Sequence, residues 1–109
     1  MSTVWYIKDL SVLDLSPTLV EILDAVQKRW GCAVITSAYR RGDKGVHGCT
    51  PCRGVDLRAC DALGPDAANW VNEQWEYDPD RPEMVCAIYH NAGSGWHLHL
   101  QVHPNTRRV

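Results

Sequence analysis

Residues 96–102, Trp-His-Leu-His-Leu-Gln-Val, alternate apolar and polar side chains over their whole length. Because successive side chains of a strand point to opposite faces, this alternation predicts a strand with one apolar and one polar face. The apolar set, expected to face a core, is Trp96, Leu98, Leu100 and Val102. The polar set is His97, His99 and Gln101. Two imidazoles on one strand face can share a metal ion or a reacting group.

A second short strand is predicted at Gly54–Arg58, where Val55 and Leu57 alternate with Asp56. His47 lies in the long polar loop, residues 39–53, that leads into this strand. A small sheet would bring these residues to the two histidines of residues 96–102. Two histidines and one aspartate, with a further histidine beside them, are typical of a zinc hydrolase that keeps one position open for water. For each residue alone, a solvated side chain or a turn residue is the plainer alternative.

The order of predicted elements indicates an α+β fold. A helix should begin at Ser16-Pro17 and end at Gly31, because serine and proline favour helix starts and glycine favours helix ends. The other predicted elements are a strand at residues 32–37, a helix from Pro65 to about Tyr77, a turn at residues 78–82, a strand at residues 84–89, a loop at residues 90–95 and a hairpin partner at residues 96–103. We therefore expect a single domain over residues 1–109, with a small antiparallel sheet, helices packed on one face and a zinc site on the other.

The composition narrows the possible partners. The formal net charge is −2, and the basic clusters at residues 40–41 and 107–108 are too small to follow a phosphate backbone, so no nucleic-acid partner is expected. The apolar runs are too short for a membrane span. The first residues lack the pattern of a signal peptide, which predicts synthesis in the cytoplasm. The oligomeric state is left open, with a monomer as the default expectation.

The chain has five cysteines, so they cannot all pair within one molecule. Cys49 and Cys52 form a C-x-x-C motif, and Cys60 follows closely. A packing role, a local disulfide and a second metal site all remain open for these three. A thioredoxin-like role is not expected, because Cys49 follows a Gly-rich loop rather than a strand. Cys32 and Cys86 lie in apolar runs and should be buried as small hydrophobic residues.

Four short motifs in this order resemble those of the M15-type zinc D-alanyl-D-alanine peptidases, which group with the lysostaphin-like peptidases and the hedgehog signalling domain. The motifs are Ser37-Ala-Tyr-Arg40, His47, Gly54-Val-Asp56 and Gly95-Trp-His-Leu-His99. The family pattern is Ser-Gly-Tyr-Arg, then Ser-x-His-x-x-Gly-x-Ala-x-Asp, then a terminal His-x-His or Glu-x-x-His. The resemblance spans roughly residues 15–102.

The resemblance implies that His47, Asp56 and His99 bind Zn²⁺ and that His97 is the general base or stabilises the transition state. It also implies that Arg40 contacts substrate or a developing oxyanion. Two features differ from the family. The spacing from His47 to Asp56 is longer, and the excess coincides with the C-x-x-C motif. No glutamate base precedes the terminal histidines, so only the His-x-His form applies, with His90 as a lesser supporting candidate or a plain surface residue.

These residues lead to one main functional hypothesis and two alternatives. The main hypothesis is a zinc metallopeptidase, a carboxypeptidase or an endopeptidase, that hydrolyses D-Ala-containing bonds of peptidoglycan stem peptides in the bacterial cell wall. Such a protein could be encoded by a phage as an endolysin-like enzyme and released to the wall. The first alternative is a catalytically inactive zinc-binding module of the same fold that acts in binding or structure. The second is a metal-free interaction domain whose histidines are incidental.

Overall fold

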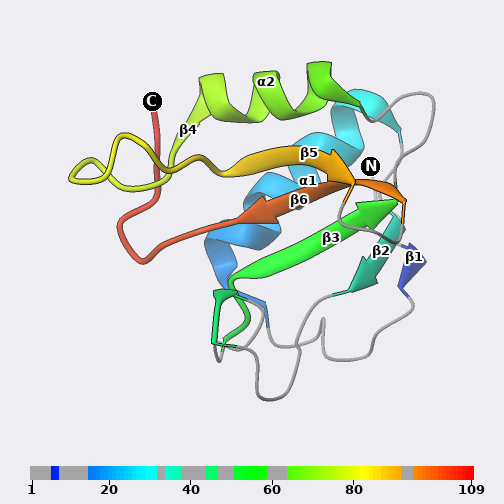
Figure 1. The fold of residues 1–109 in the computed structure, drawn as a ribbon, viewed down its shortest axis with the longest axis horizontal. Helices are drawn as coiled ribbons and strands as arrows, with labels where there is room; N and C mark the ends of the chain where they lie inside the picture. Colours follow the sequence, from blue (N-terminus) through cyan, green and yellow to red (C-terminus); the bar gives the residue numbers. More distant parts are fainter. Residues whose placement is uncertain are drawn as a thin grey trace.

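The computed structural model describes residues 6–7, 15–31, 34–37, 44–46, 51–58, 64–91 and 95–109. Predictions that fall on other residues lie outside this part of the chain. The described residues form two α-helices and seven short strands (Figure 1), in the order β1 (Tyr6–Ile7), α1 (Pro17–Trp30), β2 (Val34–Ser37), β3 (Gly54–Arg58), α2 (Pro65–Gln74), β4 (Trp75–Glu76), β5 (Ala87–Asn91), β6 (Trp96–Gln101) and β7 (Arg107–Arg108).

The main sheet has the strand order β1-β2-β3-β6-β5. Strands β2, β3, β6 and β5 pair in antiparallel fashion, and β1 joins β2 in parallel. Strand β6 therefore lies between β3 and the edge strand β5, as Figure 1 shows. The predicted α+β class with an antiparallel sheet is confirmed.

One face of this sheet packs against both helices. The alternate residues of β3 and β6 that face the helices, Val55, Leu57, Leu98 and Leu100, are fully buried. They share one core with residues from α1 and α2, including Leu19, Ile22, Leu23, Val26, Ala67 and Val71. Fully burying a leucine or valine side chain contributes about 1.5–3 kcal/mol, so this shared core holds the helices against the sheet.

Helix α1 has the predicted boundaries. Pro17 occupies the first helical position and Ser16 precedes it, although the Ser16 side chain makes no capping hydrogen bond. Gly31 ends the helix in the left-handed conformation, with φ of 70°, and its N–H donates to the Gln27 carbonyl oxygen at 2.7 Å. A residue with a side chain would be strained at this φ, so glycine favours this helix end.

Three predictions about local structure are wrong. Helix α2 ends at Gln74 rather than near Tyr77, because Trp75 and Glu76 are extended and pair with β7. Strand β5 starts at Ala87 and continues through Asn91, so His90 belongs to a strand and not to a loop. Pairing of β5 with β6 extends the strand at this end. Trp96 is 57% exposed rather than part of the core.

The predicted turn after α2 is confirmed. The Asp78 carboxylate accepts a hydrogen bond from the Asp80 N–H at 3.0 Å, and the Asp78 carbonyl oxygen accepts one from the Arg81 N–H at 2.9 Å.

No helix within the described ranges has the length and apolar character needed to cross a membrane.

Candidate functional site

The face of the sheet opposite the helices carries three histidines and one aspartate. Strand pairing places Asp56 of β3 directly opposite His99 of β6, and His97 of β6 directly opposite His90 of β5. Because directly opposed residues share a face in an antiparallel sheet, their four side chains gather on the polar side. We call Asp56, His90, His97 and His99 the His-Asp cluster.

Within this cluster, Asp56 and His99 make the closest contact. The Nδ1 atom of His99 lies 2.9 Å from Oδ1 of Asp56. The Nε2 atom of His97 lies 3.8 Å from the same oxygen. Asp56 is buried, and the side chains of His97 and His99 are 14% and 12% exposed. The carboxylate is thus shielded from bulk water by two imidazoles.

Gln101 fixes the hydrogen-bonding state of His99. Its side-chain nitrogen donates to the Val85 carbonyl oxygen at 2.8 Å, which directs its oxygen, Oε1, toward His99. Oε1 lies 3.1 Å from Nε2 of His99 and can only accept a hydrogen bond. Nε2 of His99 therefore carries a proton. In a neutral imidazole this leaves the Nδ1 lone pair facing the Asp56 carboxylate, and a cation or a second proton is needed between the two atoms.

His97 is oriented in a similar way. Its Nδ1 atom lies 3.2 Å from the Gly95 carbonyl oxygen and can donate to it. In the neutral ring, a proton on Nδ1 leaves Nε2 as an unprotonated acceptor on the side of Asp56. His97 can therefore accept a proton at Nε2 while its ring is held from behind by the backbone.

His90 joins the cluster, although its predicted place was the loop after β5. Its ring centroid lies 4.5 Å from that of His97 and 6.2 Å from that of His99. Desolvation lowers the pKa of His90, and the neighbouring His97 and His99 lower it further, whereas Asp56 acts in the opposite direction. His90 thus favours its neutral form beside the other two rings. The sequence signal for this placement was weak, because it depends on the pairing of His90 with His97.

The structure brings together three of the five predicted site residues, namely Asp56, His97 and His99. His47 and Arg40 lie outside the described residues. The same is true of Cys32, Cys49 and Cys60.

Two cysteines are described, and both are buried. The Sγ atom of Cys52 lies 3.1 Å from the Gly54 carbonyl oxygen. Cys86 is buried as predicted, and this burial raises the pKa of its thiol to about 11. Its reactive thiolate form is therefore disfavoured at neutral pH.

The donor set can be compared with the needs of zinc. Within the described segments, no group of three or more His, Cys, Asp or Glu side chains is arranged to hold a metal ion. The Asp56 carboxylate and His99 Nδ1 nevertheless meet in the way that two ligands of one cation do, and the outer nitrogen of His99 has the hydrogen-bond partner that metal-bound histidines usually have. An imidazole and a carboxylate fit zinc, and a further ligand is needed to complete a catalytic site.

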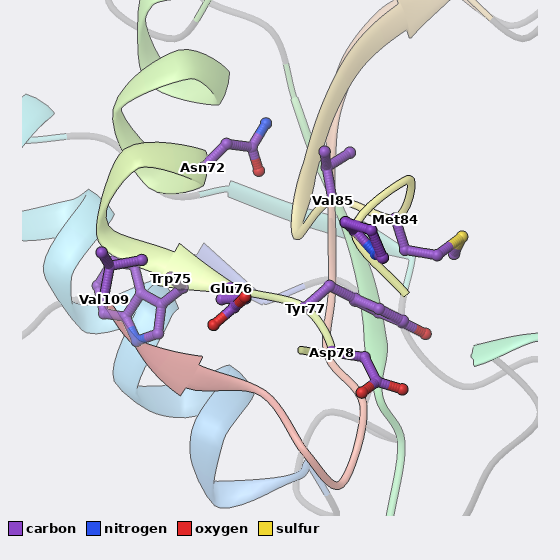
Figure 2. Close-up of a pocket in the computed structure, with 9 residues that line it drawn as sticks. Asn72, Trp75, Glu76, Tyr77, Asp78, Met84, Val85 and Val109 are labelled. Carbon is purple, nitrogen blue, oxygen red and sulfur yellow. The ribbon is translucent and has the colours of Figure 1, made fainter. Parts of the chain in front are cut away.

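A separate cavity of about 290 Å³ lies below the end of α2. Figure 2 shows Asn72 of α2 above it, Trp75–Asp78 along the segment that follows this helix, and Met84 and Val85 on the opposite side. The indole N–H of Trp75, one of the lining residues, is buried and has no hydrogen-bond partner among the described residues. None of the His-Asp cluster lines this cavity, so it does not serve that site.

No protein family model, curated protein or solved structure matches the chain.

Proposed function

We propose that the chain is a zinc-dependent peptidase that hydrolyses D-Ala-containing bonds of peptidoglycan stem peptides. The observation that carries this proposal is the contact between Asp56 and His99, with the outer nitrogen of His99 held by Gln101. A solvated surface pair would not need a buried glutamine to fix one ring nitrogen. A metal ligand does, because the hydrogen bond orients the ring and raises its basicity.

Asp56, His99 and His47 would hold the ion, with Asp56 and His99 supplying one carboxylate oxygen and Nδ1. Bound zinc would lower the pKa of a water molecule and polarise the scissile carbonyl. His97 would act as general base through Nε2, which lies on the same side as the Asp56 carboxylate. His90 would keep the site free of an additional positive charge, because its pKa is lowered.

The substrate class is supported by the order of the motifs Ser37–Arg40, His47, Gly54–Asp56 and Gly95–His99. Arg40 would contact the substrate or the oxyanion, because guanidinium groups bind carboxylates and developing oxygen anions through paired N–H donors. The partner we propose is the peptidoglycan stem peptide, and neither nucleic acid nor a membrane is proposed as a partner.

Metal content is the first test. Protein purified without a histidine tag and dialysed against trace zinc should retain about one zinc ion per chain. Asp56→Asn and His99→Ala should lose it, whereas His103→Gln should keep it. His103 is a matched control because it also contacts an aspartate, Asp78, at 3.6 Å, but lies outside the cluster. Zinc content unaffected by Asp56→Asn and His99→Ala would contradict the site.

Activity is the second test. Release of D-alanine or stem fragments from purified murein should occur with the zinc-loaded protein and stop with a chelator. His97→Ala should lower the rate by about 10²–10⁴-fold, the usual contribution of a general base, and should retain zinc. Bound zinc without hydrolysis of D- or L-peptides would refute the peptidase and support the inactive zinc-binding module.

A further inference from the structure

A second hollow, separate from the cavity at the end of α2, lies between the β5–β6 hairpin and the first turns of α2. It is on the side of the hairpin that is opposite to the His-Asp cluster. Its volume is about 420 Å³. Tyr89 and Trp96 form one wall, and Ala68, Asn69 and Asn72 of α2 form the other. Figure 1 shows α2 running along β5, and the two elements are in contact. The hollow is on the helix face, so the sheet separates it from the His-Asp cluster.

Two aromatic rings are stacked at this hollow. The ring centroids of Tyr89 and Trp96 are 5.0 Å apart and their planes differ by 20°. Trp96 is 57% exposed, whereas Leu98 and Leu100, which follow it on the same face of β6, are fully buried. Tyr89 stacks on one side of the indole, and the indole presents a broad flat apolar surface to solvent. Exposed apolar surface of this kind indicates a binding site when polar groups lie beside it.

The polar groups that the described residues contribute to the hollow are neutral. This described part of the lining contains two side-chain amides, Asn69 and Asn72, and no Asp, Glu, Lys, Arg or His. Asn69 is exposed on α2. Among the described lining residues there is thus no cationic donor of the kind that recognition of a phosphate or a carboxylate needs.

An extended peptide fits this hollow poorly. A peptide that adds to a sheet needs unpaired backbone groups at the edge strand. At Ala87 of β5, the Asn72 amide already occupies these groups. Its nitrogen donates to the Ala87 carbonyl oxygen at 2.9 Å, and its oxygen accepts the Ala87 N–H at 2.9 Å. Asn72 thus occupies the edge of β5 at Ala87, so an added strand would lose its hydrogen bonds at this position.

We propose that the hollow binds a neutral sugar ring in the pyranose form. A pyranose has a flat face of C–H groups that can lie on the indole of Trp96, and hydroxyl groups around its rim that can exchange hydrogen bonds with the amide of Asn69. The sugar therefore fits the hollow in two ways: its flat face is complementary to the indole, and its neutral hydroxyl groups are complementary to the neutral amide. This site would give the chain a means of binding a polysaccharide that is independent of metal and of hydrolysis.

The experiment is a titration of the full chain with tri-N-acetylchitotriose and with maltotriose, followed by tryptophan fluorescence and by the ¹H–¹⁵N spectrum. Binding of either sugar, with shifts at Tyr89, Trp96 and Asn69, is the expected result, and the comparison distinguishes an acetamido sugar from a plain glucan. Trp96→Ala should weaken binding by about tenfold or more, since it removes the stacking surface. Ile88→Ala is the control, because Ile88 is also a partly exposed apolar residue of β5 but lies on the other face.

Three outcomes would overturn this inference. These are no binding of either sugar at about 10 mM, equal binding by the Trp96→Ala variant, and binding of an apolar peptide in place of the sugars. Chelator should not change sugar binding, and Trp96→Ala should not change zinc content. The sugar site and the zinc site can thus fail separately.

Discussion

Replacing Gln101 with leucine should weaken zinc binding by the chain about 10- to 100-fold, the usual effect of removing the outer partner of a metal-bound histidine. Gln101 is 8% exposed and joins Nε2 of His99, at 3.1 Å, to the Val85 carbonyl oxygen, at 2.8 Å. Leucine fills a similar volume but accepts no hydrogen bond. The His99 ring would then lose its fixed tautomer, and the change corresponds to about 1.4–2.7 kcal/mol of binding free energy. Competition with a chromophoric chelator measures the dissociation constant.

The Gln101→Glu variant separates metal binding from folding. Glutamate keeps an acceptor for the His99 N–H but cannot donate to Val85 when ionised. Both variants should lower the free energy of unfolding of the metal-free protein by about 1–3 kcal/mol, because buried polar groups lose their partners. Only Gln101→Leu should also weaken zinc binding. Wild-type affinity in Gln101→Leu, or an equal loss in both variants, would refute the assignment of His99 Nδ1 as the metal-binding atom.

Further predictions concern metal, pH and the core. A chelator should lower the melting temperature of the wild type but not that of Asp56→Asn, since only a chain that binds the ion in its native state is stabilised by it. Equal decreases in melting temperature for the two proteins would contradict this. The folded-state pKa of His90 lies below its ordinary value of 6.5, so the unfolded chain binds the proton first and stability falls as the pH drops below that value. In the presence of a chelator, the free energy of unfolding measured with urea should therefore fall less for His90→Gln than for the wild type between about pH 7.5 and about pH 5.5. Identical decreases in the two proteins would refute this. In the same assay, Leu98→Ala should lower the free energy of unfolding by about 2–5 kcal/mol and Trp96→Ala by less than about 1 kcal/mol. The reason is that Leu98 is fully buried and Trp96 is not.

Local signals in the sequence predicted those parts of the fold that local chemistry determines. The alternation over Gly54–Arg58 and Trp96–Gln101 placed their side chains on the correct faces, except that Trp96 is largely exposed. The proline and glycine at Pro17 and Gly31 gave the ends of α1, because each restricts or permits backbone angles by itself. These features need no knowledge of distant residues.

Features that depend on distant partners were not predicted. Strands β4 and β7 have two residues each, too few for a periodic pattern, and they form because Trp75–Glu76 meets Arg107–Arg108. An ion pair between Glu76 and Arg107, at 3.0 Å, and the Arg108 guanidinium over the Trp75 ring, at 4.6 Å, accompany this pairing. Such contacts end α2 early and are invisible in a local window of sequence.

The candidate site also has features that the local sequence predicts and features that depend on distant residues. The polar faces of β3 and β6 were predicted, but periodicity alone does not say whether Asp56 lies opposite His97 or His99, because both share one face. The register places Asp56 opposite His99. Gln101 could have been found as a third polar residue at the same spacing, whereas its link to Val85 depends on the fold.

The register of β3 and β6 connects the stability of the fold to the chemistry of the site. A slip by one residue would move Val55 and Leu57 out of the core, so burial forbids it. A slip by two residues would keep every side chain on its face but would exchange His99 for His97 opposite Asp56. What opposes the second slip is a set of polar contacts at the other end of the strands. The Val102 N–H donates to the Arg53 carbonyl oxygen at 2.9 Å, which holds β6 against the residue before β3, and the Gln101 bond to Val85 holds β6 against the segment before β5. The hydrophobic core thus selects the face that carries the ligands, and these hydrogen bonds select which histidine meets the aspartate.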